Sequence, residues 1–235
     1  MNPVYLCADL SGDTVVLGGA EGRHAATVRR TRAGEVVDLV DGLGTRVTGN
    51  VTAVGKGTVT VQVTACVVEP PVSPRLTLVQ AIAKGDRGEL AVETATEAGV
   101  DEVVPWAASR CVVRWEGERG AKALERWRST AREAAKQARR ARFPVVREPV
   151  TTRTVAALPG TVLVLHESAT ERLVDVPLDG DVVLVVGPEG GVSDEELAVL
   201  TGAGATAVRL GLTVLRTSTA GVAGIAVVSA RTGRW

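Results

Sequence analysis

From residue 76 onward, short apolar segments with the character of β-strands alternate with segments that have the pattern of helices. The strand segments include LTLVQAIA, TVLVL, VVLVV and AVRL, and helix-like stretches such as GELAVETATEAG and DEELAVLTGAG lie between them. Such alternation is typical of a parallel sheet with helices on both faces. In an open sheet of this kind, a ligand binds where the loops meet beyond the carboxyl ends of the strands. This part of the sequence therefore predicts an α/β domain with its site in those loops.

The chain before residue 70 has a different pattern. The β-branched stretches EVVDLV, TRVTGNVTAV and GTVTVQVTACVV are separated by the turn signals DGLG and VGKG, and the proline-rich EPPVSPR follows them. This pattern predicts a small antiparallel β-barrel. Because 235 residues are enough for two domains, we expect the β-barrel to span residues 1–72 and the α/β domain to span residues 73–235.

Three of the predicted strands end in loops that we expect to share one pocket. TVLVL ends at HES, VVLVV ends at GPEGG, and AVRL ends at GLTVLRTSTA. In the second loop, Ser193 and Glu196 have the spacing of a capping box, so a helix is expected to begin there. Gly187, Gly190 and Gly191 permit either a close approach of a ligand to the backbone or a simple tight turn.

The acidic residues of the GPEGG loop limit what it can bind. Phosphate-binding loops present N–H groups and usually a basic side chain, whereas this loop has Glu189 and is followed by Asp194, Glu195 and Glu196. A polyphosphate would be repelled, so we expect a neutral, zwitterionic or cationic ligand. VGKGT around Lys56 lacks the spacing of a Walker loop, and no GxGxxG follows a strand. P-loop and Rossmann nucleotide sites are therefore disfavoured.

Basic residues gather in two stretches although the formal net charge is zero. Between Arg119 and Arg142 there are nine basic residues and two acidic ones, and a second group lies in GRHAATVRRTR. Both stretches favour a nucleic-acid partner. For the first stretch, a charged helix face exposed to solvent is the alternative.

Cysteine usage and hydropathy exclude several other classes of protein. Cys7, Cys66 and Cys111 are far apart and lack CxxC spacing or nearby histidines, so they predict neither a disulfide framework nor a metal site. We expect all three to be buried as small hydrophobic residues. No uncharged apolar run approaches the roughly 20 residues that span a bilayer, and MNPVYLCADLSGD lacks the pattern of a signal peptide. A cytoplasmic protein with no membrane partner is expected.

Several longer stretches resemble one family. GPEGGVSDEEL followed by LGLTVLRTSTA resembles the paired C-terminal signature of the RsmE family, the 16S ribosomal RNA uracil-N3 methyltransferases of the SPOUT superfamily. QAIAKGDRGELAVETATEAGVDEVVPWAASRCVVRW is similar to the family's first strand and helix, and AREAAKQARRARFP to its basic helix. GRHAATVRRTRAGEVVDLVDGLG is similar to its N-terminal RNA-binding region. The resemblance extends over nearly the whole chain.

The resemblance implies a PUA-like N-terminal β-barrel followed by a SPOUT α/β methyltransferase domain with a C-terminal trefoil knot. It also implies a homodimer, with the active site near the subunit interface, and S-adenosylmethionine bound in a bent form by the knot loops. The sulfonium of this zwitterion is cationic, so the acidic side chains of the loop would not repel it. The apolar helix AGVAGIAVVSA is a candidate for the dimer interface, and burial within its own subunit is the alternative. Carried over by motif, the cofactor-binding residues are Leu165, His166, Glu167, Gly187, Pro188, Glu189, Gly190, Gly191, Leu210, Gly211, Val214, Leu215 and Arg216.

The implied reaction is methyl transfer to N3 of uracil, which becomes nucleophilic only when its proton leaves. Arg216 is the candidate for stabilising the uracil anion. His166 and Glu167 are candidates for the base. For His166 the alternative is packing against the cofactor, and for Glu167 it is a local hydrogen bond. Many family members read LRTETA where this chain has Ser218, so we assign no role to a glutamate there.

The implied acceptor is 16S rRNA or the small ribosomal subunit, held through phosphate contacts. With 3% aromatic residues, a broad stacking platform is not expected. Lys84 and Arg87 either lie near the uracil oxygens or form structural salt bridges. Alternatives to this function are another SPOUT specificity, such as tRNA or 23S rRNA ribose methylation, and a non-catalytic ribosome-assembly protein. The candidate RNA-binding residues are Arg23, Arg29, Arg30, Lys84, Arg87, Arg139, Arg140 and Arg142.

Overall fold

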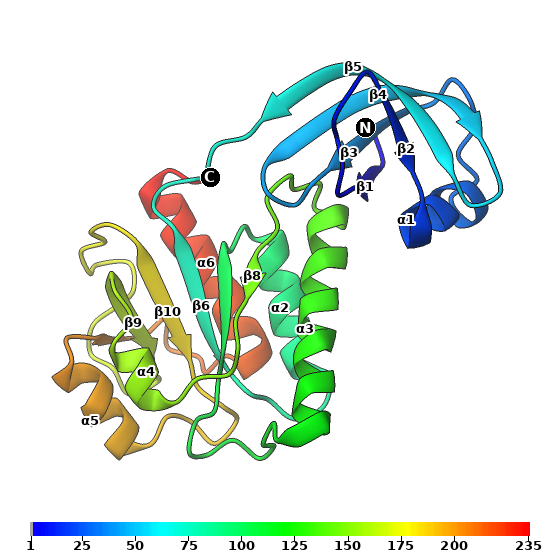
Figure 1. Ribbon diagram of the computed structural model, residues 1–235. Coiled ribbons are helices and arrows are strands. Elements are labelled where there is room, and N and C mark those ends of the chain that lie inside the picture. Colours follow the sequence, from blue (N-terminus) through cyan, green and yellow to red (C-terminus); the bar gives the residue numbers. More distant parts are fainter. Residues whose placement is uncertain (1) are drawn as a thin grey trace. The chain divides into compact units, whose positions relative to one another are not determined.

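The computed structural model describes residues 2–235 and divides into two compact units (Figure 1). The first unit contains the chain up to Pro71 together with Ala135–Phe143, and the second contains Val72–Ala134 together with Pro144–Trp235. Residues 135–143 therefore belong with the N-terminal part of the chain, which no local pattern in the sequence indicated. Within residues 2–235, no helix has both the length and the apolar character needed to cross a membrane.

The first unit is built on a five-stranded sheet with the strand order β1-β3-β4-β5-β2. β1 pairs with β3 in parallel, whereas the other neighbouring strands are antiparallel. The prediction of a wholly antiparallel barrel is thus wrong for one pair. The chain between β1 and β3 includes β2 and a helical segment, which provide the crossover that a parallel pair requires. The strands are β1 (Val4–Leu6), β2 (Thr14–Leu17), β3 (Val36–Val40), β4 (Thr45–Val54) and β5 (Val59–Val68).

The side chains of these strands alternate between one apolar core and solvent. Tyr5, Leu17, Leu39 and Val61 are buried in this core. Cys66 is exposed and Cys7 and Cys111 are only half-buried, so the expectation of three buried cysteines is wrong. The error at Cys66 arises because the second half of β5 is largely open to solvent, where alternation no longer indicates burial.

Two further segments complete the first unit. α1 (Gly19–Arg23) continues directly into a π-helix, η1 (His24–Val28), and Arg30 after it has a φ of 54°. In the other segment, Ala141 and Phe143 pack with Val4 and Val40 of the sheet. This contact explains why residues 135–143 are part of the unit.

The second unit contains a six-stranded sheet with the strand order β11-β9-β10-β6-β7-β8. Every neighbouring pair is parallel, as the alternation of strands and helices predicted. Strands buried on both faces are the rule in such sheets, and all five residues of β10 are buried. The strands are β6 (Leu76–Ala81), β7 (Glu102–Trp106), β8 (Val145–Val146), β9 (Thr161–Leu165), β10 (Val182–Val186) and β11 (Thr206–Val208).

Successive side chains of these strands enter two separate cores, one on each face of the sheet. In β10, Leu184 faces the core that also contains residues of α2 (Arg87–Glu97), α3 (Gly117–Gln137) and α6 (Thr217–Thr232). Its neighbour Val185 faces the core that is covered by α4 (Thr152–Ala156) and α5 (Asp194–Gly202). Figure 1 shows the same arrangement, with α4 and α5 on one side of the sheet. The result is a three-layer α/β unit.

The apolar helix α6 packs against the sheet of its own unit. A Cβ at Gly221 would lie 3.1 Å from Leu78, and one at Gly224 would lie 3.2 Å from Leu184. Ile225 and Val228 are buried in the same core. Close packing within the unit therefore accounts for the small residues of this helix.

Candidate functional site

A cavity of about 540 Å³ opens at the carboxyl ends of β9 and β10, beside the start of α6. A smaller cavity of about 80 Å³ adjoins it and shares Leu165, Glu167, Val214 and Leu215 as lining residues. The three loops that follow β9, β10 and β11 thus contribute to one site, as expected from the sequence. Each of the following candidate residues lines one or both cavities: Leu165, His166, Glu167, Gly187, Pro188, Glu189, Gly190, Gly191, Leu210, Gly211, Val214, Leu215 and Arg216.

Some residues that line the larger cavity were not among the candidates drawn from the sequence. They include Val192, Thr217 and Ala220. Thr217 and Ala220 belong to the first turn of α6, directly after the LGLTVLR stretch. Their position next to that motif could have identified them as site residues. Because they are three residues apart on a helix, both side chains face the cavity.

The glycine loop, residues 187–191, is fixed at its first residue by a buried chain of hydrogen bonds. Thr217 Oγ1 donates to the Gly187 carbonyl at 2.7 Å, and Gln80 Nε2 donates to Thr217 Oγ1 at 3.1 Å. A Cβ at Gly187 would lie 2.8 Å from Val192, and Gly191 has a φ of +74°. The glycines at these two positions are therefore required by the turn itself.

Glu189 in the same loop is held by the segment that follows β6. Arg87 Nη1 donates to Glu189 Oε1 at 2.9 Å, and the backbone N–H of Lys84 donates to the same oxygen at 3.3 Å. Partial burial alone would raise the pKa of Glu189, but hydrogen bonds, including these two, hold that pKa below its ordinary value. The loop's acid is therefore ionised and paired. The sequence left two roles open for Arg87, a position near the uracil oxygens and a structural salt bridge. The salt bridge to Glu189 is present, and the guanidinium also lines the cavity.

The end of the glycine loop leads into α5 through the predicted capping box, which is confirmed. Ser193 Oγ accepts from the Glu196 N–H, and Glu196 Oε2 accepts from the Ser193 N–H. Glu196 also accepts from the N–H and the hydroxyl of Ser109 and from the hydroxyl of Thr152. Burial would raise the pKa of Glu196, and these hydrogen bonds outweigh it and lower the pKa. Arg110 adds donations to the carbonyls of Gly190 and Val192.

The three candidate catalytic residues surround the two cavities. Arg216 is exposed at the N-terminus of α6 and lines the larger cavity. Glu167 is exposed and lines both cavities. His166 lines the smaller one, and its Nδ1 accepts from the Ser168 N–H at 3.3 Å and lies 2.9 Å from the Ser168 hydroxyl. Ser218 is buried in the first turn of α6.

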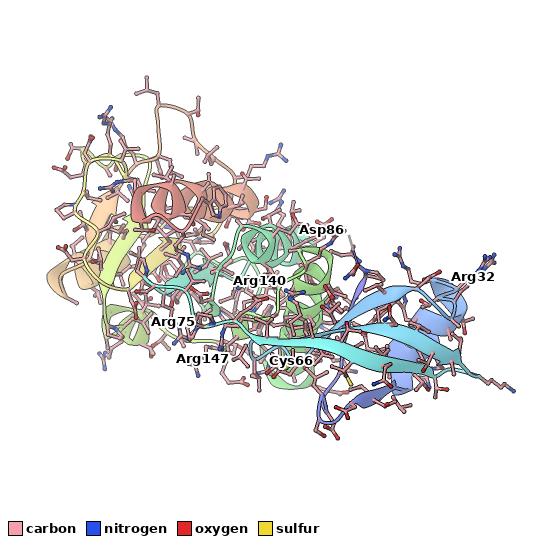
Figure 2. All side chains as sticks on the ribbon, turned by 90° about the horizontal axis from the view of Figure 1, so that it is seen from above. Arg32, Cys66, Arg75, Asp86, Arg140 and Arg147 are labelled. Atoms are coloured by element: carbon pink, nitrogen blue, oxygen red, sulfur yellow. The ribbon has the colours of Figure 1, made fainter. Side chains whose placement is uncertain are left out.

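The candidate RNA-binding residues fall into the two units. Arg23, Arg29 and Arg30 are exposed on the helical turn of the first unit and form no ion pair within residues 2–235. Arg32, labelled in Figure 2, extends the same turn, and its side chain points away from the ribbon. This turn therefore presents a basic surface.

Of the other candidates in the first unit, Arg139 is exposed and Arg140 is half-buried. Arg142 is also half-buried, and its Nε donates to the Glu69 carbonyl at 2.9 Å. This bond gives Arg142 a structural role in the unit. Lys84 and Arg87 belong to the second unit, next to the glycine loop.

The comparisons with known proteins agree with this fold and site. Residues 69–229 match the RNA methyltransferase domain family, and residues 17–64 match the PUA domain of RNA methyltransferases. The class is thus an RNA methyltransferase domain preceded by a PUA-type domain. A relative from Mycobacterium bovis, ribosomal RNA small subunit methyltransferase E, is 49% identical over 96% of this chain and 89% of its own length. The chain belongs to the ribosomal RNA small subunit methyltransferase E family, RsmE, which confirms the resemblance seen in the motifs.

Two solved structures have the same fold along almost their whole length. Ribosomal RNA small subunit methyltransferase E from Neisseria gonorrhoeae, bound to S-adenosylmethionine, has a TM-score of 0.89 and 30% identity, with 98% of each chain covered. A methyltransferase from Legionella pneumophila, in complex with the same cofactor, has a TM-score of 0.90 and 31% identity, again over 98% of each chain.

Proposed function

We propose that this protein transfers a methyl group from S-adenosylmethionine to N3 of a uridine in 16S ribosomal RNA. One observation carries the proposal. In a chain of the RsmE family, the GPEGG and LGLTVLR loops line one cavity at the carboxyl ends of the strands. The proposal includes the homodimer and the C-terminal knot that the resemblance implies.

The residues of the site are suited to S-adenosylmethionine. A volume of about 540 Å³ lies in the usual range for small-molecule sites. Leu165, Val214 and Leu215 provide apolar walls for an adenine ring. Within the described chain, the backbone groups of residues 210–215 make no hydrogen bond to protein, so they are available to the polar edge of the ring. The carboxylates of Glu167 and Glu189 favour a cation over a polyphosphate.

The cofactor supplies an electrophilic methyl group on a sulfonium. For the transfer, the uracil N3–H proton passes to a base, a bond forms between N3 and the methyl carbon, and the carbon–sulfur bond breaks. Negative charge develops on the uracil oxygens when the proton leaves. Arg216 is exposed at the cavity, where a guanidinium stabilises such charge.

Glu167 is the base that the geometry favours. The Nδ1 lone pair of His166 already accepts from the Ser168 N–H, so in the neutral ring Nε2 carries the proton and cannot accept another. Glu167 is exposed, lines both cavities and forms no ion pair within residues 2–235. In this proposal His166 packs beside the cofactor, and Glu167 takes the proton from N3.

The test is methyl transfer from labelled S-adenosylmethionine to small subunits that lack the modification, followed by nucleoside analysis. The expected product is 3-methyluridine. Glu167→Gln and Arg216→Met are expected to lower kcat at least about a hundredfold, as loss of a base or of a charge-stabilising group does. Glu171→Gln and Arg153→Met, at exposed positions away from the cavities, serve as matched controls. Methylation of another nucleotide would contradict the substrate, and cofactor binding without transfer to any RNA would favour an assembly role.

A further inference from the structure

A second and larger cavity, of about 1150 Å³, lies in the second unit between α2, α3 and the segment before α3. We call it the tryptophan groove, because Trp115 and Trp127 both line it. The two indole rings meet edge to face, with centroids 4.9 Å apart. Trp127 is buried, whereas Trp115 keeps part of its surface exposed in the groove. None of the candidate site residues drawn from the sequence lines this groove, although Arg119, Lys122, Arg126 and Arg132 belong to the basic stretch that favours a nucleic-acid partner.

The rim of the tryptophan groove is rich in basic side chains. Five basic residues line it, against three acidic ones. Lys122, Arg126 and Arg132 each pair with a glutamate. Arg114 and Arg119 are exposed and form no ion pair with any described residue. Their charge is therefore available to an external anion.

The groove and the candidate active site are neighbours on the two sides of one short loop. Arg87 lines the 540 Å³ cavity, whereas Ala83, Gly85 and Asp86 line the tryptophan groove. This loop is fixed, because Glu189 accepts from both Lys84 N–H and Arg87. Figure 2 labels Asp86, the residue that precedes α2. The groove therefore lies within reach of the neighbouring units of a polymer that has one unit in the active-site cavity.

We infer that the tryptophan groove binds the single-stranded RNA that flanks the target uridine, with a base stacked on Trp115 and phosphates held by Arg114 and Arg119. The inference rests on the proposed function. Single-stranded RNA is favoured because proteins that bind it combine an aromatic platform with a positive groove that follows the backbone. A single half-buried tryptophan provides a platform for one base, which is compatible with the low aromatic content of the chain.

Two measurements test the inference separately from the reaction. The first is binding of a fluorescently labelled, uridine-containing RNA oligonucleotide of about ten nucleotides to the full-length protein over a series of salt concentrations. The double variant Arg114→Ala/Arg119→Ala is expected to bind about tenfold more weakly, with a salt slope smaller by roughly 1.4, the value for two phosphate contacts to a single strand. Trp115→Leu is expected to lose at least about fivefold, as removal of a stacking partner does. Arg153→Ala, an exposed arginine on α4 without an ion pair among the described residues, is the matched control and is expected to bind as the wild type does.

The second measurement is methyl transfer to small subunits. The groove variants are expected to raise KM for the RNA with kcat and cofactor affinity unchanged. Thermal melting shows whether Trp115→Leu still folds, and the arginine variants keep the test valid if it does not. RNA binding by both groove variants equal to that of Arg153→Ala would overturn the inference. So would an effect of the groove variants on self-association alone, since the groove would then contact protein. If the wild type binds the oligonucleotide at the groove but makes no 3-methyluridine, the proposed function fails and the groove assignment stands.

Discussion

Two of the loops that line the 540 Å³ cavity are held by the chain in different ways. The glycine loop, residues 187–191, is held by side chains from three other segments. Thr217 donates to its first carbonyl, Arg87 pairs with its glutamate, and Arg110 donates to the carbonyl of Gly190. The capping box of α5 then fixes the residues that follow.

The leucine loop, residues 210–215, has no such support. None of its backbone groups is hydrogen-bonded to protein in the part of the chain that the structure describes. Its side chains include Leu212 and Val214, which are 93% and 78% exposed. Few buried contacts and free backbone groups are the features of segments with low local stability.

The difference indicates that half of the site is preformed and half is completed by its ligand. A preformed glycine loop loses little conformational entropy on binding, whereas ordering the leucine loop opposes binding. We therefore expect changes to the supports of the glycine loop to alter folding stability, and ligand to alter mainly the leucine loop.

The largest expected effect is on stability, from Glu196→Ala. Glu196 is 7% exposed and accepts hydrogen bonds from Ser109, Thr152 and Ser193. Without the carboxylate, the buried N–H of Ser193 and the less buried donors of Ser109 and Thr152 lose their acceptor, so the free energy of unfolding should fall by about 3 kcal/mol. Urea denaturation measures the change. Glu195→Ala, at the exposed neighbouring position, should have a much smaller effect, because solvent screens that carboxylate. Equal effects of the two substitutions would show that the glycine loop does not depend on this buried acceptor.

The side chains that hold the glycine loop could not be predicted from the sequence, although the loop itself could. The loop itself and its capping box lie next to apolar strands, and strand periodicity locates them. Gln80, Arg110 and Thr152 contact this region from other parts of the chain, and nothing in their local sequence specifies the partner. The same reason explains why the parallel pairing of β1 and β3, and the contact of Phe143 with the N-terminal sheet, were not predicted.

The basic stretches of the sequence predicted exposed arginines correctly at one turn but not at Arg142. The turn with Arg23, Arg29 and Arg30 is exposed, as a basic patch suggests. Arg142 belongs to the other basic stretch, yet its guanidinium is half-buried against the Glu69 carbonyl. A count of charges cannot distinguish these two situations, because burial depends on residues distant in the sequence.

The second prediction concerns Thr217→Val, which removes the hydroxyl that joins Gln80 to the Gly187 carbonyl. The side chain keeps its shape, but the half-buried Gly187 carbonyl loses its donor, and the buried Gln80 Nε2 loses one acceptor although it still donates to the Ala81 carbonyl. We expect a loss of about 1–2 kcal/mol of stability and a severalfold rise in the Kd for S-adenosylmethionine, measured by calorimetry. Thr217→Ser should restore both values. Thr219→Val changes an exposed hydroxyl of the same helix turn and is the control. Unchanged affinity in Thr217→Val would mean that the Gly187 carbonyl needs no fixed position.

The third prediction is a pH dependence from the Arg87–Glu189 pair. The pKa of Glu189 is lower in the folded state than its ordinary value of 4.5. The ionised carboxylate therefore makes its full contribution to the free energy of unfolding at pH values above 4.5, and this contribution is lost as the pH falls through the lowered pKa. Arg87→Met removes the salt bridge and should cost about 0.5–1 kcal/mol at pH 7, since both side chains are partly exposed. The difference from wild type should shrink as the pH falls below 4.5. A difference that stays constant down to the lowest pH at which both proteins fold would exclude the carboxylate as its cause.

The smallest expected effect is local and concerns the leucine loop. Amide hydrogen exchange should be fast at residues 211–215 in the free protein, because those N–H groups have no protein acceptor within residues 2–235. Exchange should be slower at residues 190–193, where the Gly191 N–H donates to the Pro188 carbonyl. Addition of S-adenosylmethionine should then protect the leucine loop more than the glycine loop, since only the former has to become ordered. Similar exchange in both loops before ligand is added would show that the site is preformed on both sides, and the entropic cost assigned to the leucine loop would have no basis.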